Sequence, residues 1–117
     1  MSFFRNLGIY DFHNIRDLSA LGTCHSLKLY NCGNISDVSA LGKCHSLKLL
    51  YCKNILDVSA LGKCHSLKLY RLNIRDVSAL GKCHSLVLDS CLNIRDVSTL
   101  QNVPNLKIIN CANIIKN

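Results

Sequence analysis

The chain is 117 residues long and carries 14 lysines and arginines against seven aspartates, which gives a formal net charge of +7. This length allows one domain and leaves no room for a second. No apolar stretch reaches the roughly 18 residues of a membrane-spanning helix, and the start, Met-Ser-Phe-Phe-Arg-Asn, lacks the apolar run of a signal peptide. We therefore expect a single domain, residues 1–117, in the cytoplasm.

One unit recurs along the chain, and its clearest copy is residues 44–63, CHSLKLLYCKNILDVSALGK. Its apolar residues are Cys44, Leu47, Leu49, Cys52, Ile55, Val58 and Leu61. Only the step of two between Leu47 and Leu49 has the alternation of a β-strand. The steps of three suit a 3₁₀-like turn, in which residues i and i+3 eclipse each other. Each unit therefore predicts a short strand, a corner and a tightly wound return.

The copies align as six coils. Their approximate bounds are 4–23, 24–43, 44–63, 64–82, 83–102 and 103–117. The fourth coil is one residue short between Leu69 and Ile74, and the sixth is truncated. A fixed period of this kind indicates a solenoid, because each unit can bury its apolar face only by stacking on its neighbours.

The spacing of Leu47, Leu49, Cys52, Ile55 and Asp57 resembles the cysteine-containing leucine-rich repeat, whose family range is about 20–29 residues. The segment DVSALGKC, preceded by N-I, is similar to the repeats in proteins of large DNA viruses of amoebae. The resemblance implies an α/β leucine-rich-repeat solenoid, wound as a right-handed superhelix. It also implies a parallel sheet on the concave side, short 3₁₀ or helical turns on the convex side, and protein binding on the concave sheet.

Eight cysteines raise the question of a disulfide scaffold, but their positions favour free thiols. They fall in two inward slots of the repeat, which Phe4, Phe12 and Val103 fill in the outer coils. The first slot holds Cys24, Cys44, Cys64 and Cys83, and the second holds Cys32, Cys52, Cys91 and Cys111. Residues that exchange with Phe and Val serve as apolar fillers. Buried reduced thiols fit an intracellular, reducing compartment.

Three recurring polar or small positions have structural explanations. Each aspartate of one row lies two residues before a serine and is expected to cap the helical turn, although a row of carboxylates also suggests a metal ladder. This row is Asp17, Asp37, Asp57, Asp76 and Asp96. A row of asparagines suits a corner whose backbone groups need side-chain partners. It is Asn14, Asn34, Asn54, Asn73, Asn93 and Asn113. Gly22, Gly42, Gly62 and Gly81 follow the turn, where a positive φ is often required.

Adjacent Cys-His pairs at 24–25, 44–45, 64–65 and 83–84 raise the hypothesis of a zinc or nucleophilic site. Neighbouring side chains on a strand point to opposite sides, so each Cys should face the core and each His the solvent. No C-x-x-C or H-x-x-x-H spacing is present. A column of histidines about 4.8 Å apart would bind a transition metal only fortuitously. We therefore expect no enzyme activity, and no catalytic, cofactor-binding or metal-binding residues.

The concave face carries the candidate partner site. Lysines alternate there with tyrosines, a pattern typical of platforms for single-stranded nucleic acid, so nucleic acid or another polyanion is the alternative to a protein partner. Basic residues elsewhere, such as Lys43 and Arg75, mean that the charge is not focused on this face. Departures from the repeat cluster in coils four and five. The predicted partner-binding residues are Tyr30, Lys48, Lys68, Tyr70, Arg71, Val87 and Asp89.

The last coil predicts a second interaction. It leaves apolar side chains and a strand edge around Leu106 to Ile108 without a polar cap. Two such edges related by a two-fold axis would run antiparallel and extend the sheet. We expect a homodimer through Leu106, Ile108, Ile109, Ile114 and Ile115.

Overall fold

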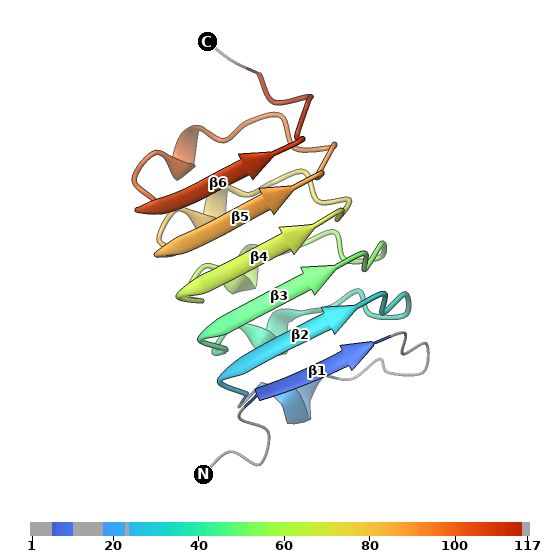
Figure 1. Ribbon diagram of the computed structural model, residues 1–117. Coiled ribbons are helices and arrows are strands. Elements are labelled where there is room, and N and C mark those ends of the chain that lie inside the picture. The colour runs from blue at the N-terminus through green and yellow to red at the C-terminus, as the bar shows by residue number, and fades with distance from the viewer. Residues whose placement is uncertain (1–5, 11–17, 23, 116–117) are drawn as a thin grey trace.

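The computed structural model describes residues 6–10, 18–22 and 24–115. A single parallel sheet holds six strands in chain order (Figure 1). They are β1 Asn6–Tyr10, β2 Ser26–Tyr30, β3 Ser46–Leu50, β4 Ser66–Tyr70, β5 Ser85–Asp89 and β6 Asn105–Ile109. Equivalent residues of successive coils pair with one another, so Leu47 aligns with Leu27 on one side and Leu67 on the other. The predicted solenoid with a parallel sheet is confirmed.

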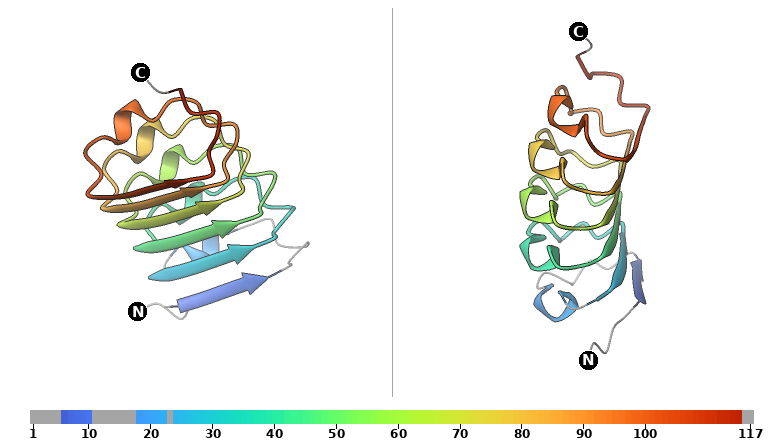
Figure 2. Two further views of the ribbon diagram at one scale, coloured as in Figure 1. Left: turned by 45° about the horizontal axis from the view of Figure 1, so that its top comes forward. Right: turned by 90° about the vertical axis from the view of Figure 1, so that its left-hand side faces the viewer.

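Short 3₁₀ turns form the layer opposite the sheet (Figure 2). They are η1 Ser19–Leu21, η2 Ser39–Leu41, η3 Ser59–Leu61, η4 Ser78–Leu80 and η5 Ser98–Leu100. Each 3₁₀ turn covers only three residues. The apolar spacing of three predicts a 3₁₀-like path over the whole return segment. Between Cys52 and Val58 the chain instead makes a turn and then an irregular segment. A spacing of three cannot distinguish these states, because an extended polyproline-type path also has three residues per turn.

The core lies between the sheet and the 3₁₀ turns. Side-chain burial alternates along β2 to β5, with Leu47 and Leu49 of β3 at 1% and 0% exposure. Within the described ranges no polar or charged side chain is buried. The core is therefore a column of aliphatic side chains and thiols that passes through successive coils.

All eight cysteines are free and buried, as their inward slots predict. Each thiol of the second slot lies near carbonyl oxygens of its own and the preceding coil, for example Cys52 Sγ at 3.4 Å from the oxygen of Leu50 and 3.8 Å from that of Leu29. Desolvation raises the pKa of Cys52 to about 11 and that of Cys64 to about 12. Cys52 and Cys64 thus stay protonated, and the buried thiols act as packing groups with weak hydrogen bonds.

The aspartate and asparagine rows have the structural roles that the sequence predicts. The carboxylate of Asp57 accepts a 2.9 Å hydrogen bond from the backbone N–H of Ser59, and Asp37, Asp76 and Asp96 repeat this contact at 2.8–2.9 Å. The bond to Ser59 lowers the pKa of Asp57. Asparagine side chains join the corners, as where Asn73 Nδ2 donates to the oxygen of Lys53 at 3.1 Å. Asn54, Asn93 and Asn113 make equivalent contacts. Asp17 and Asn14 lie outside the described residues.

The expectation that the recurring glycines need a positive φ is wrong. Gly22, Gly42, Gly62 and Gly81 have φ between −65° and −62°, which any residue adopts. They are glycines because neighbouring coils approach closely at this point. A Cβ on Gly42 would lie 2.6 Å from the carbonyl oxygen of Ala60 in the next coil. Left-handed backbone occurs instead just after the strands, at Asn31 (φ 55°), Tyr51 (59°), Arg71 (52°), Ser90 (58°) and Asn110 (55°).

The short fourth coil loses its residue at the corner and not in the core. Arg71 is left-handed like Tyr51, and Leu72 is 1% exposed in the slot that Cys52 fills one coil earlier. Asn73 then follows directly, so the position of Lys53 is missing. Leu72 is therefore a core residue that the sequence alignment did not assign to any slot. The coils keep their stacking because the deletion removes an exposed residue.

Candidate functional site

The face of the sheet that points away from the core carries six of the seven predicted partner-binding residues. We call this surface, which the sequence predicts as the concave face, the outer face. In β2 to β5 these side chains are half-buried and alternate with the core leucines. Lys48, Lys68 and Val87 form one column in strand register. Tyr30, Leu50, Tyr70 and Asp89 form the next column. The face is therefore a flat surface of lysine stems and tyrosine rings, and it changes character at β5, where Val87 and Asp89 replace a lysine and a tyrosine.

Arg71, the seventh predicted residue, lies just after the end of β4. It belongs to the row of residues with left-handed backbone, Asn31, Tyr51, Arg71, Ser90 and Asn110, which we call the left-handed row. The backbone N–H groups of this row continue the sheet ladder, as in the 2.8 Å bond from Arg71 N to the oxygen of Asp89. Equivalent bonds run from Tyr51 to Tyr70 at 3.0 Å and from Ser90 to Ile109 at 2.8 Å. A left-handed conformation costs a non-glycine residue about 1–2 kcal/mol. The ladder bond holds the side chains of this row at the rim of the outer face.

Three side chains meet at this rim. The rings of Tyr30 and Tyr51 make an edge-to-face contact with centroids 5.3 Å apart. The guanidinium carbon of Arg71 lies 5.5 Å from the centroid of Tyr51, within cation–π range. Tyr51 remains 41% exposed. We call Tyr30, Tyr51 and Arg71 the rim cluster.

Tyr51 is not among the predicted partner-binding residues, because the departures from the repeat that guided the prediction lie in coils four and five. A signal was available in the sequence, because the residue at this position in the other coils is Asp11, Asn31, Arg71, Ser90 or Asn110. A tyrosine at such a position is a departure in coil three. Its contact with Arg71 could not be anticipated, because it depends on the left-handed backbone at both residues.

An open recess lies beside the rim cluster, where the fourth coil lacks its corner residue. It has a volume of about 540 Å³ and is lined by Arg71, Leu72, Asn73, Ser90, Leu92 and Asn110. Leu92 is 53% exposed at its edge. Nearby, the hydroxyl of Ser90 donates a 2.8 Å hydrogen bond to Asp89. The departures in coils four and five therefore give the outer face a shaped margin with an arginine, a carboxylate and an apolar edge.

The predicted dimer residues lie on and after β6, the last strand of the sheet. Ile108 occupies the core slot of Leu88, yet it is 37% exposed whereas Leu88 is 0% exposed. Ile109 and Ile115 are 42% and 62% exposed, and Leu106 and Ile114 are half-buried against the core. The backbone N–H of Ile115 donates to the oxygen of Arg95 at 2.7 Å, which fixes the end of the last described coil. An apolar surface thus borders the outer edge of β6.

The histidines form a stack on the exposed turns that precede the strands. Ring centroids of His25, His45, His65 and His84 are 4.6–4.7 Å apart, with planes within 13° of parallel. Nitrogen lone pairs lie in the ring planes, so stacked rings do not converge on one ion. No group of three or more His, Cys or Asp side chains among the described residues is arranged to hold a metal. Desolvation, and then the charges of His45 and His84, lower the pKa of His65.

The fold has a counterpart among solved structures. The crystal structure of an internalin (inlF) from Listeria monocytogenes matches with a TM-score of 0.67 and 25% sequence identity over 95% of this chain. This chain covers 39% of that protein's chain. No protein-family model and no curated protein matches. The likeness confirms the leucine-rich-repeat solenoid, and the resemblance to viral repeat proteins stays a prediction.

No helical segment in the described ranges has the length and apolar character of a transmembrane span.

Proposed function

We propose that this chain is a non-enzymatic interaction module that binds a protein partner through the outer face of its sheet. The observation that carries this proposal is the rim cluster. Tyr and Arg are the side chains most often found at the energetic centres of protein interfaces. Tyr51 is 41% exposed and held between Tyr30 and Arg71, so it presents a rigid aromatic surface at low entropic cost.

Residues around the rim cluster support the same face. Tyr70, Val87 and Asp89 lie next to it in β4 and β5, and the recess in coil four adds a concave margin. These positions differ from coil to coil, whereas most of the surface is copied with the repeat. Eight buried free thiols fit a reducing compartment, so we place the module inside a cell.

Nucleic acid is the alternative occupant, because Lys28, Lys48 and Lys68 form a basic column on the same face. Two observations favour protein. Asp89 places a carboxylate in the tyrosine column, where it would repel phosphate. The guanidinium of Arg71 lies 5.5 Å from the centroid of the Tyr51 ring, so a base that stacked on that side of the ring would have to displace it.

The test is capture of partners from the native host with wild-type protein and with a variant carrying Tyr51→Ala, Arg71→Ala and Asp89→Ala. All three side chains are exposed or half-buried, so the fold should persist. A matched control carries Leu56→Ala, Arg75→Ala and Arg95→Ala at other exposed positions. We expect a protein that the control retains and the rim variant loses. Loss in the control alone would contradict the proposal, and binding to single-stranded DNA that falls steeply with salt would favour the nucleic-acid alternative.

We further propose that the module forms a homodimer through β6. The backbone on the outer side of an edge strand pairs readily with another strand. Burying Ile108 and Ile109 would remove apolar area from water at about 25 cal/mol per Å². Two β6 strands related by a two-fold axis would run antiparallel and join two sheets.

Sedimentation equilibrium at tens of micromolar tests this dimer. We expect the wild type to be dimeric and Ile108→Lys to be monomeric. Leu56→Lys adds the same charge at a residue that is 64% exposed elsewhere, and it should leave the dimer intact. A monomeric wild type, or a dimer that Ile108→Lys leaves unchanged, would refute the proposed interface.

A further inference from the structure

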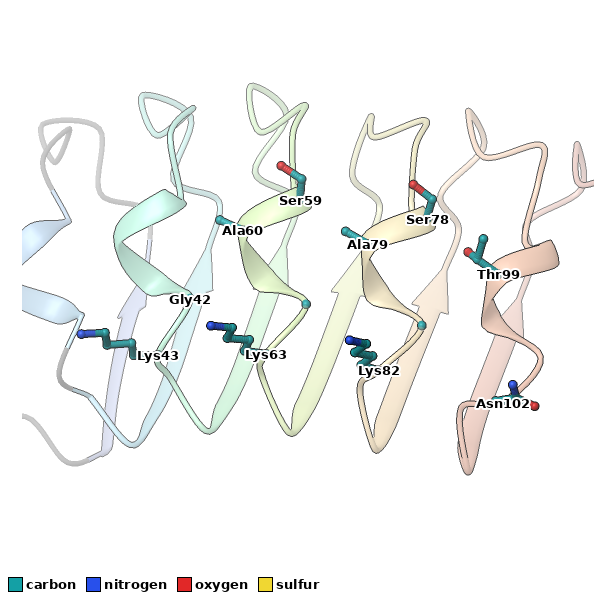
Figure 3. Close-up of a pocket in the computed structure, with 12 residues that line it drawn as sticks. Gly42, Lys43, Ser59, Ala60, Lys63, Ser78, Ala79, Lys82, Thr99 and Asn102 are labelled. Atoms are coloured by element: carbon teal, nitrogen blue, oxygen red, sulfur yellow. The ribbon is translucent and has the colours of Figure 1, made fainter.

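A second surface lies on the opposite side of the solenoid from the rim cluster and the sheet. It is an open groove of about 750 Å³ that crosses four successive coils along the 3₁₀ layer (Figure 3). Its lining residues fall into a row of lysines and a row of small side chains. The lysines are Lys43, Lys63 and Lys82, and the small residues include Ser59, Ala60, Ser78, Ala79 and Thr99.

The groove exists because of how the coils pack. Gly42, Gly62 and Gly81 lie between the two rows, where the next coil's carbonyl oxygen leaves no space for a Cβ. The 3₁₀ turns present only Ala and Ser or Thr at their exposed positions. Figure 3 shows the lysine side chains lying in a line beside these turns. The strict packing of the coils thus produces a smooth floor with one basic wall.

The groove is electrostatically one-sided. Three lysines line it and no carboxylate does. Asp57 lines an adjoining depression that shares Ser59 and Ala60 with the groove, and its carboxylate accepts a hydrogen bond from the backbone N–H of Ser59 on the side away from the lysines. The lysine row spans coils two to four and ends at Asn102 in coil five. A ligand of this groove must therefore carry negative charge on the side that faces the lysine row. Its opposite side must be narrow enough to contact the alanine and serine side chains.

The repeat distance favours one kind of ligand. The histidine rings of successive coils are 4.6–4.7 Å apart, close to the usual spacing of about 4.7–4.9 Å between neighbouring strands, so equivalent residues should repeat at about this distance along the groove. Residues i and i+3 of an α-helix lie about 4.5 Å apart along its axis. Same-face residues of an extended strand are about 6.6–6.8 Å apart, so a strand drifts by about 4 Å over two coils.

We propose that this groove binds an α-helix of a partner protein that carries an acidic stripe at positions i, i+3 and i+7. The helix lies along the solenoid axis, with its carboxylates on the lysine row and small or apolar side chains against Ala60 and Ala79. Exposed ion pairs contribute only about 0.2–1 kcal/mol each, so the contact with the alanines must supply part of the affinity. This inference is independent of the proposed outer-face function, because it uses none of those residues.

The probe is a fluorescent, lactam-bridged helical peptide of about 14 residues with glutamates at i, i+3 and i+7, measured by fluorescence anisotropy. A control peptide has the same composition with the glutamates distributed around the helix. The protein variant carries Lys43→Gln, Lys63→Gln and Lys82→Gln. The matched control carries Lys28→Gln, Lys48→Gln and Lys68→Gln, which removes the same charge from the sheet face.

We expect the groove variant to weaken binding of the striped peptide about 10-fold or more, and the sheet-face variant to change it less than about 2-fold. A second variant, Ala60→Gln with Ala79→Gln, fills the groove at exposed positions without changing charge and should also weaken binding. Equal losses in both lysine variants, equal affinity for the two peptides, or unchanged binding after filling would overturn the proposal. So would tighter binding of single-stranded DNA at the same lysines, which would assign the row to a polyanion.

Discussion

Gly62 packs against the carbonyl oxygen of Ala79 in the next coil so closely that a Cβ would overlap it. We expect Gly62→Ala to destabilise the protein by about 1–3 kcal/mol, because the backbone of the neighbouring coil must shift. Gly33 supplies the control, since nothing lies within 4 Å of a Cβ added there. Gly33→Ala should be neutral or stabilising by up to about 1 kcal/mol. Urea unfolding midpoints distinguish the two, and equal midpoints would contradict this account of the glycine row.

In the left-handed row, a substitution to glycine is expected to stabilise the protein. Ser90 has a φ of 58°, which is unfavourable for a side chain with a Cβ. Ser90→Gly should therefore stabilise the protein by about 0.5–1 kcal/mol, even though it removes the contact with Asp89. Ser66→Gly, within β4, should destabilise by about 0.5–1 kcal/mol, because glycine weakens a regular strand. Thermal unfolding of the two variants provides the measurement, and a loss of stability in both would argue against strain at Ser90.

The sequence predicts features that depend on one coil, and it fails where two coils meet. The inward slots of Leu47, Leu49 and the cysteines follow from spacing alone, and so do the caps at the aspartates. The reason for glycine at Gly62 lies in the carbonyl of Ala79, which is 17 residues away and close only after stacking. The assignment of Leu72 to a cysteine slot needs the backbone at Arg71 to fix the register.

The candidate sites divide in the same way. The outer-face columns follow from strand alternation, which places Lys68 and Tyr70 on one face. The rim cluster needs the left-handed conformation of Tyr51 and Arg71, which no local residue preference indicates. The groove beside Lys63 depends on the distance between neighbouring 3₁₀ turns and so cannot be read from one repeat.

The cysteines should resist alkylation until the fold opens. Desolvation raises the pKa of Cys44 to about 11 and that of Cys64 to about 12, well above the ordinary thiol value of 9.0. At pH 8 the thiolate fraction is then about 100-fold or more below that of a free cysteine, in addition to steric protection. We expect iodoacetamide to label few of the eight thiols in native buffer and all of them in urea, as counted by mass spectrometry. Rapid native labelling of Cys64 would show that the core column is accessible to solvent.

The histidine stack predicts that stability decreases in mild acid. The pKa of His65 is lowered in the folded protein by desolvation and by His45 and His84, so the folded state binds fewer protons than the unfolded state. Stability therefore rises with pH through the window at and below the ordinary histidine pKa of about 6.5. The aspartate caps have lowered pKa values, and their contribution is lost only at lower pH, below about 4. The two effects thus occupy separate pH ranges.

Unfolding midpoints between pH 7.5 and pH 5 should fall for the wild type and fall less for His65→Gln, which cannot acquire a charge in the stack. Asp57→Asn supplies the control, because it removes a group that titrates outside this range and should leave the slope between pH 7.5 and pH 5 unchanged. Equal slopes in the wild type and His65→Gln would mean that the stacked rings tolerate the positive charge. In that case the close spacing of 4.6 Å between His65 and its neighbours would reflect coil packing alone.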